Sequence, residues 1–162
     1  MKAKLYFLTA LLLATMGVCG CSSSDDEEKA LVQSRWSGCK NESVNDETRS
    51  GNQSPWGEES VEYESKNGGQ LYLKHVNALF NCATENVEVT ATVNGRRISI
   101  VERGIGNSAN CICPMDVECL LRGLSAGKYT ISIYKNKDSE SDLQFSFTID
   151  YNDSLKGMYK KE

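Results

Sequence analysis

The stretch from Cys111 to Tyr134 constrains the fold of this chain more than any other. On each side of a Gly-Leu-Ser-Ala-Gly connector, apolar and polar residues alternate with a period of two. The apolar positions are Val117, Cys119 and Leu121 before the connector, and Tyr129, Ile131 and Ile133 after it. Because successive side chains of a strand point to opposite faces of a sheet, this alternation predicts two half-buried β-strands.

The same periodicity recurs over residues 61–64, 71–80 and 143–149. About seven strands over roughly ninety residues is the scale of a two-sheet sandwich, and no stretch after the leader has helical periodicity. The sequence therefore predicts an all-β fold, an antiparallel sandwich of about seven strands.

A hairpin is expected where Asn94-Gly95 separates two alternating runs, because this dipeptide favours a two-residue turn. With these two residues as the turn, Ala91 faces Ile98 and the apolar side chains of both strands lie on one face.

The N-terminal segment has the regions of a secretory signal peptide. Lys2 and Lys4 precede an apolar run, Leu5–Val18, that is too short for a comfortable membrane span. The following Val-Cys-Gly-Cys resembles the bacterial lipobox, whose last cysteine, here Cys21, is acylated and becomes the first residue. We expect a lipid anchor on Cys21, with palmitate among its acyl chains, holding the protein to a membrane. Plain signal-peptidase cleavage would instead leave Cys21 free or in a disulfide.

Residues 22–29, SSSDDEEK, form a solvated tether that cannot bury apolar surface. The run resembles the Ser-Asp-Asp-type signal that follows the lipidated cysteine in Bacteroides-type Gram-negative bacteria and sends lipoproteins to the cell exterior. The resemblance implies a lipid-anchored outer-membrane protein at the cell surface, with the periplasmic face of that membrane as the alternative.

The charge of the chain argues against nucleic-acid binding. The formal net charge is −4, and without the two leader lysines 16 basic residues stand against 22 acidic ones, or −6. An acidic body with no basic block has no electrostatic reason to bind a polyanion. The expected partners are the membrane, through the anchor, and a glycan or protein ligand.

These features divide the chain into five parts. They are the signal peptide (1–20), the lipidated cysteine with the acidic tether (21–30), an irregular N-terminal region (31–58), the β-sandwich domain (59–151) and a polar tail (152–162).

Five cysteines remain after the leader and Cys21, and an exported protein meets an oxidising compartment. We expect Cys82 to pair with Cys111 or Cys113, and Cys39 with the other. A bond from Cys82 across roughly thirty residues would stabilise the fold by about 3–4 kcal/mol. Cys119 alternates with apolar residues and is expected to be a buried free thiol. The alternative is a zinc or thiol site at Cys82, Cys111, Cys113 and Cys119, although their spacing is not that of a zinc knuckle.

Two patterns carry a resemblance to known families. Gly123–Tyr129 resembles a Gly-Leu-x-x-Gly-x-Tyr turn of secreted Ig-like and prealbumin-like modules, in which the Tyr seals the edge of the core. Together with Asn81-Cys82, Cys111-Ile112-Cys113, Asp116 and the lipobox, it resembles a family of short lipoproteins of Bacteroides-type bacteria. The resemblance implies an Ig-like or prealbumin-like β-sandwich and an envelope location, but no activity.

No catalytic constellation, cofactor motif or metal site is predicted. The expected function is that of a non-enzymatic binding or structural module of the cell envelope, and Trp56, in a Pro-Trp-Gly turn, is a candidate ligand-contact aromatic. The alternative is a hydrolase using carboxylates such as Asp116, Glu102 or Glu118.

Two further residues are assigned by the sequence. His75, the single histidine, is expected to be structural or merely exposed. Asp153-Ser154-Leu155 resembles an O-glycosylation signal of exported Bacteroides-type proteins, which makes Ser154 a candidate modification site.

Overall fold

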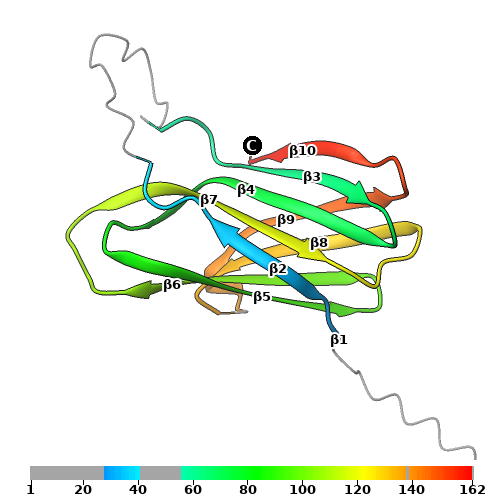
Figure 1. Cartoon of the computed structure of the whole chain (residues 1–162), viewed down its shortest axis with the longest axis horizontal. Helices are drawn as coiled ribbons and strands as arrows, with labels where there is room; N and C mark the ends of the chain where they lie inside the picture. Colours follow the sequence, from blue (N-terminus) through cyan, green and yellow to red (C-terminus); the bar gives the residue numbers. More distant parts are fainter. Residues whose placement is uncertain (1–27, 41–55, 138, 162) are drawn as a thin grey trace, which may run out of the picture.

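The computed structural model describes residues 28–40, 56–137 and 139–161, which form two facing β-sheets (Figure 1). The first sheet has the order β1-β5-β6-β8-β9, with bounds Glu28–Lys29, Thr84–Asn94, Arg97–Gly106, Gly127–Lys135 and Leu143–Tyr151. The second has the order β10-β3-β4-β7-β2, with bounds Lys156–Lys160, Ser60–Lys66, Gln70–Asn81, Ile112–Leu121 and Leu31–Trp36. A short 3-10 turn, Glu140–Asp142, precedes β9. The all-β sandwich is confirmed.

One pair of strands departs from the expected antiparallel arrangement. β6 and β8 are parallel, while the other neighbours in both sheets are antiparallel. The reason is topological: after β6 the chain crosses to the second sheet for β7 and returns to the first sheet as β8 in the original direction. The two alternating runs around the Gly-Leu-Ser-Ala-Gly connector are therefore strands of opposite sheets.

The core lies between the sheets and is built from the alternating apolar positions of both. Fully buried side chains include Leu71, Leu73, Ile98, Ile100, Met115, Leu121, Ile131 and Ile133. Each of these lies on the inward face of its strand, as the period of two requires.

The connector between β7 and β8 closes one end of this core. Leu124 is buried, and its N–H donates to the carbonyl of Gly69 in the turn between β3 and β4 (3.1 Å). Buried Tyr129 accepts a hydrogen bond on its hydroxyl from the Ser125 N–H (3.2 Å). In the Gly-Leu-x-x-Gly-x-Tyr pattern, the Leu thus fills the end of the core, and the Tyr hydroxyl holds the connector in place.

The β5–β6 hairpin exists, but its turn lies one residue further along the chain than the sequence predicted. Asn94 pairs with Arg97, so the turn residues are Gly95 and Arg96, and Ala91 pairs with Ile100 rather than Ile98. Gly95 has a φ of +57°, as the first position of such a turn requires. The pairing shifts by two residues, so the apolar side chains still share the buried face.

A tertiary contact explains this register. The Arg96 guanidinium lies over the Tyr129 ring, 4.8 Å from its centroid, and donates to the Ser125 carbonyl (3.0 Å). The Arg96 carbonyl also accepts the N–H of Thr130 (3.0 Å). These contacts hold Arg96 in the turn, against the local preference for Asn-Gly.

The sandwich extends further at both ends than expected. The described residues form ten strands, counting the two-residue β1. β1 lies in the expected tether, β2 in the expected irregular region, and β10 in the expected polar tail, where it pairs with β3.

β1 and β2 are consecutive but belong to different sheets, and buried Ala30 is the crossing point. Its N–H donates to the Ala91 carbonyl of the first sheet (3.0 Å), and its carbonyl accepts the N–H of Arg122, the residue after β7 (2.9 Å). After Ala30 the chain pairs with β7 instead of β5.

β10 belongs to the domain because its aromatic side chain packs inward. The Tyr159 ring stacks on Phe147 of β9 with centroids 4.7 Å apart and meets Phe145 edge-on at 6.1 Å. Tyr63 of β3 stacks on the same Phe147 at 5.8 Å. This aromatic cluster closes the interior between the edge strands β9 and β10.

Candidate functional site

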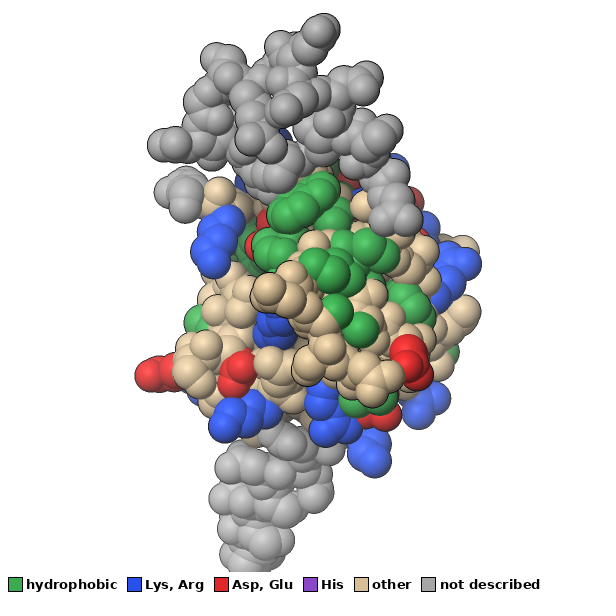
Figure 2. Space-filling model, turned by 90° about the vertical axis from the view of Figure 1, so that its left-hand side faces the viewer, with side chains coloured by type: hydrophobic (Ala, Val, Ile, Leu, Met, Phe, Trp, Pro, Cys, Tyr) green, Lys and Arg blue, Asp and Glu red, His purple; other side chains and the backbone are tan. Residues whose placement is uncertain are grey.

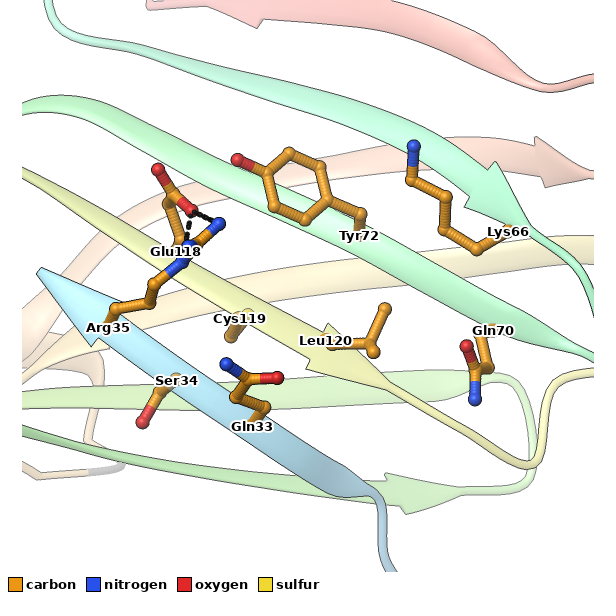
Figure 3. A pocket seen from close by; sticks show the side chains of 9 residues that line it. All are labelled: Gln33, Ser34, Arg35, Lys66, Gln70, Tyr72, Glu118, Cys119 and Leu120. Carbon is orange, nitrogen blue, oxygen red and sulfur yellow. Dashed lines mark hydrogen bonds and ion pairs between the residues drawn. The ribbon is translucent and has the colours of Figure 1, made fainter.

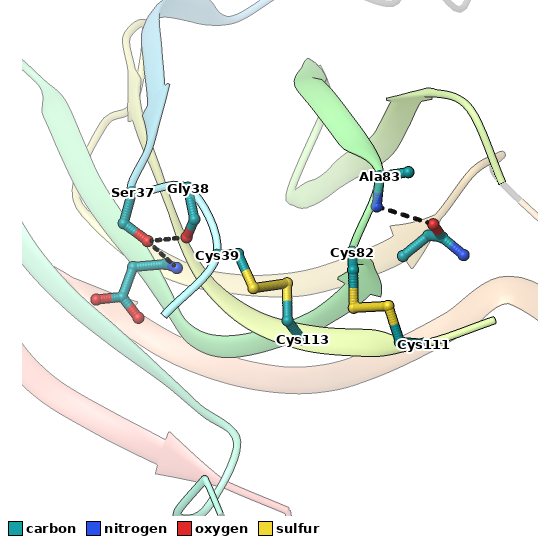
Figure 4. The surroundings of a disulfide bond; sticks show 9 residues. Ser37, Gly38, Cys39, Cys82, Ala83, Cys111 and Cys113 are labelled. Atoms are coloured by element: carbon teal, nitrogen blue, oxygen red, sulfur yellow. Dashed lines mark hydrogen bonds between the residues drawn. A yellow bond between two sulfur atoms is a disulfide. The ribbon is translucent and has the colours of Figure 1, made fainter. Parts of the chain in front are cut away.

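Two disulfides lie side by side at one end of the sandwich (Figure 4). Cys39 is bonded to Cys113, and Cys82 to Cys111, with Cα–Cα distances of 5.7 and 5.6 Å. Disulfide bonding is therefore confirmed, and of the two pairings left open by the sequence this is the one found. Cys119 is free and buried, and burial, together with the Glu102 charge, raises the pKa of its thiol.

This bonding leaves no thiolate cluster for the alternative zinc site. Three of its four cysteines are in disulfides, and the fourth, Cys119, is buried in the core. Within the described ranges, no group of three or more His, Cys, Asp or Glu side chains is arranged to hold a metal ion.

Asp116 lies on the outer face of the second sheet and is held in a polar network. Its carboxylate pairs with Lys40 and with Lys74 (3.0 Å) and accepts the backbone N–H of Asn77 (3.1 Å). Burial acts to raise the pKa of Asp116, but the hydrogen bonds from both lysines and from Asn77 outweigh it, so the pKa lies below its ordinary value. Asn77 sits at the β4 bulge with a φ of +58°. The network positions segment 37–40 beside β7 rather than presenting a free carboxylate.

The other two carboxylates of the hydrolase alternative are in different places. Glu118 is on the outer face and pairs with Arg35 of β2 (2.8 Å), while Glu102 is buried between the sheets and contacts His75. Each of the three carboxylates thus has its own cationic partner, and they do not form one group.

His75 lies inside the sandwich between two carboxylates. Its Nδ1 is 2.8 Å from Glu102 Oε2, and its Nε2 is 2.9 Å from Glu59 Oε1. Burial acts to lower the pKa of His75, but the Glu102 charge and the hydrogen bonds to both carboxylates outweigh burial and raise it to about 9. His75 is therefore protonated at neutral pH and joins the two sheets.

The sequence holds a signal for this pair that reasoning about strands alone missed. His75 follows Leu71 and Leu73 on the inward face of β4, and Glu102 follows Ile98 and Ile100 on the inward face of β6. A titratable side chain on a buried apolar face needs a polar partner there. Two such side chains on facing sheets are therefore expected to pair with each other.

A shallow hollow of about 390 Å³ on the outer face of the second sheet is a candidate ligand site (Figure 3). Tyr72 and Leu120 supply its apolar surface from the adjacent strands β4 and β7. Polar groups surround them from β2, β3, β4 and β7: Gln33, Gln70, Lys66 and the Arg35–Glu118 ion pair.

Tyr72 is the central side chain of this surface. Its ring is half-buried, and the Lys66 ammonium lies 5.6 Å from the ring centroid. Burial, then the charge of Glu118 and a hydrogen bond to it, raise the pKa of the Tyr72 phenol. A second hollow, lined by Tyr72, Glu62 and Met158 among others, adjoins on the β3 and β10 side. The face thus combines an aromatic ring with fixed hydrogen-bonding groups.

The disulfide-bonded end presents a different, apolar surface. Figure 2 shows hydrophobic side chains gathered at the end of the molecule where β6 ends and β7 begins. Ile105, near the end of β6, and Ile112, the first residue of β7, are exposed there, at 38% and 52%. The patch adjoins the Cys82–Cys111 bond, since Ile112 directly follows Cys111 in the chain.

The remaining sequence-assigned residues are separate from the hollow. Trp56 is half-buried in the turn before β3. Ser154 is exposed in the ordered turn between β9 and β10 and donates from its hydroxyl to Asn152 (2.9 Å), so its signal does not lie in a free tail. O-glycosylation there stays a prediction, which loss of a mass increment in Ser154→Ala would establish. Cys21 lies outside the described residues, as do the leader and most of the tether.

In the part of the chain that the structure describes, no helix is long and apolar enough to cross a membrane. Comparison of the whole chain with protein-family models, curated proteins and solved structures finds no match.

Proposed function

We propose that this protein is a lipid-anchored binding module of the bacterial cell envelope, held to the outer membrane through Cys21 and facing the cell exterior. The lipobox and the acidic run after it support the location. The Tyr72 hollow supports the binding role and carries the proposal.

The chemistry of the hollow favours a glycan as the ligand. A sugar ring has an apolar C–H face and a rim of hydroxyl groups, and Tyr72 with Leu120 offers a matching apolar surface. Gln33 and Gln70 bring amides that both donate and accept hydrogen bonds, and the Arg35–Glu118 pair adds charged donors and acceptors. An apolar surface that carries a small number of placed polar groups is typical of small-molecule sites.

A glycan array tests this assignment. The chain from residue 21 with Cys21→Ser would be applied to an array of host and cell-envelope glycans, and the affinity for any bound glycan measured by calorimetry. Tyr72→Ala is expected to weaken binding at least tenfold. The control is Tyr134→Ala, which removes a half-buried tyrosine from the outer face of the other sheet. Silence of the array, or equal loss in both variants, would reject the assignment.

The location is tested independently of the ligand. Growth with labelled palmitate should label the protein, and Cys21→Ala should abolish the label. Protease added to whole cells should remove the protein if it faces outward. Labelling that survives Cys21→Ala would refute the anchor, and protection from protease would place the protein on the periplasmic face.

A further inference from the structure

The sheet-switching of β1 and β2 leaves one edge of the first sheet without a neighbour. β1 pairs with β5 at Val93 and Thr92 only, and Ala30 adds one hydrogen bond to Ala91 before the chain leaves for the second sheet. Among the described residues, no strand pairs with the outer edge of β5 from Thr90 back to Thr84.

The backbone groups on this edge follow from the register of the hairpin. Asn94 and Arg97 close a two-residue turn and so exchange hydrogen bonds, which places the N–H and C=O groups of Thr90 and Glu88 toward β6. Those of Val87 and Val89 therefore point the other way, to the bare edge. The bond from Ala30 N–H to the Ala91 carbonyl on this same side agrees with that alternation.

The Val87 and Val89 side chains of this edge are buried, but β2, which faces them across the groove, is only partly covered. Ser34 and Trp36 of β2 pair with Cys119 and Val117, whose side chains are buried, and so face the interior. Ser34 is nevertheless exposed and Trp36 only half-buried. A groove of about 540 Å³ runs between Ser34–Trp36 of β2 and Asn86–Thr90 of β5. The groove is where one more strand of the first sheet would lie.

We propose that this groove accepts an extended peptide segment of a partner protein, which adds to the β5 edge as a strand. Its main chain would bond to the N–H and C=O groups of Val87 and Val89, continuing the line that β1 begins. Alternate side chains would face Trp36 and Ser34 or the solvent beside Glu88. The matching partner segment is therefore extended, with apolar residues at every second position.

Two other occupants fit less well. A second copy pairing β5 antiparallel with β5 around this stretch would bring Glu88, which is ion-paired with Arg103 of β6, close to its own counterpart, and two opposed carboxylates would compete for those arginines. β1 itself runs antiparallel to β5, so its N-terminal side points toward Asn94 and away from the groove. A partner peptide has neither restriction.

Amide hydrogen exchange on the full mature chain, with Cys21→Ser for solubility, is the first test. In the free protein the amides of Val87 and Val89 should exchange at least a hundredfold faster than those of Glu88 and Thr90, which bond to β6. Equal protection of all four amides would mean that the chain's own residues fill the position, and the proposal would be wrong.

Binding is then tested with an array of heptapeptides that alternate apolar and polar residues, with Trp36 emission followed in a Trp56→Phe background. A bound peptide should protect Val87 and Val89 from exchange. N-methylation of its alternate amides that face β5 should abolish binding, whereas methylation of the other set should not. Binding that is indifferent to the methylated set, or an array with no binder, would overturn the proposal.

A protein-side variant completes the test. Ser34→Glu places a charge in the groove and should weaken the peptide at least tenfold, while Ser125→Glu, the same change at an exposed serine of the β7–β8 connector, should not. Sedimentation at rising concentration detects the rival occupant: a dimer that Ser34→Glu dissociates would assign the groove to a second copy and overturn the partner peptide.

Discussion

His75 of β4 reaches across the interior of the sandwich to Glu102 of β6, with Nδ1 2.8 Å from Oε2. The two residues belong to opposite sheets, and both are buried, at 3% and 4% exposure. Glu59 completes the arrangement on the other ring nitrogen. A protonated histidine between two carboxylates is thus a charged link between the two sheets in a mostly apolar core.

The free energy of unfolding should fall as the pH rises past neutrality. His75 has a pKa of about 9 in the folded protein against an ordinary 6.5, so the folded state holds the proton more tightly. The stabilisation is complete below pH 6.5 and is lost through pH 9, by about 3 kcal/mol. Denaturant unfolding at several pH values between 6 and 9.5 measures it.

The control for this pH dependence removes both partners. His75→Leu alone should destabilise strongly, because Glu102 is left as a buried charge without its cation. His75→Leu with Glu102→Leu should recover part of that loss and flatten the pH profile. An unchanged unfolding free energy in the parent chain between pH 6.5 and 9 would contradict the assignment.

Alkylation should show that one of the five cysteines is a free thiol that is buried in the folded protein. In the chain from residue 21 with Cys21→Ser, native protein should take up no alkylating reagent, because Cys119 is buried and its pKa is raised. Denatured protein should take up one, and denatured, reduced protein five, as intact mass reports. More than one modification without reduction would refute the two disulfides.

The two disulfides should differ in their contribution to stability. They close loops with sequence separations of 74 and 29 residues. In the loop-entropy model these correspond to about 4.5 and about 3.5 kcal/mol. Cys39→Ala with Cys113→Ala should therefore lower the free energy of unfolding more than Cys82→Ala with Cys111→Ala. The reverse order, measured by urea unfolding, would show that local packing outweighs the loop length.

Neighbouring glycines in the β3–β4 turn should tolerate alanine unequally. Gly68 and Gly69 both have positive φ, +78° and +70°. A Cβ at Gly68 would meet nothing within 4 Å, whereas one at Gly69 would lie 2.7 Å from the Leu124 carbonyl oxygen. Gly68→Ala should cost about 1–2 kcal/mol from the backbone alone. Gly69→Ala should cost clearly more in thermal unfolding, and equal losses would mean that the Leu124 connector yields.

β10 should contribute to stability through one side chain. Tyr159→Ala removes a ring stacked on Phe147 and should cost about 2 kcal/mol. Met158→Ala, the adjacent residue at 49% exposure, should be nearly neutral. Chemical unfolding of the two variants, compared with the parent chain, checks this. Similar stabilities of the two variants would mean that residues 152–162 do not stabilise the fold, as expected of a polar tail.

The strands and their buried faces could be predicted from the sequence wherever apolar and polar residues alternate. Strands such as β8 and β9 are visible because every second residue is apolar, and that pattern also indicates the face that is buried. Cys119 is a further case, since its place between Val117 and Leu121 predicts a buried thiol, as found. Local alternation was sufficient wherever a strand is buried on one face.

Long-range contacts explain what sequence reasoning missed. The Arg96–Tyr129 contact shifts the hairpin turn by one residue, and no local signal contains it. β10 reads as polar because only Tyr159 faces the core, against a ring twelve residues earlier on another strand. The Tyr72 hollow likewise draws its residues from β2, β3, β4 and β7, which only the sheet order brings together.

The Cys39–Cys113 bond also has a mechanical consequence. A load between a ligand bound on the domain and a membrane anchor would enter the fold at Glu28, so β1 and β2 would peel away first. The bond stops that unravelling at Cys39, after residues 28–38 have released about 40 Å of chain. Beyond that length the pull passes through a covalent bond into β7, which is still paired with β4 in the second sheet. Under load the domain would thus lengthen by the released segment and then resist further extension at the disulfide.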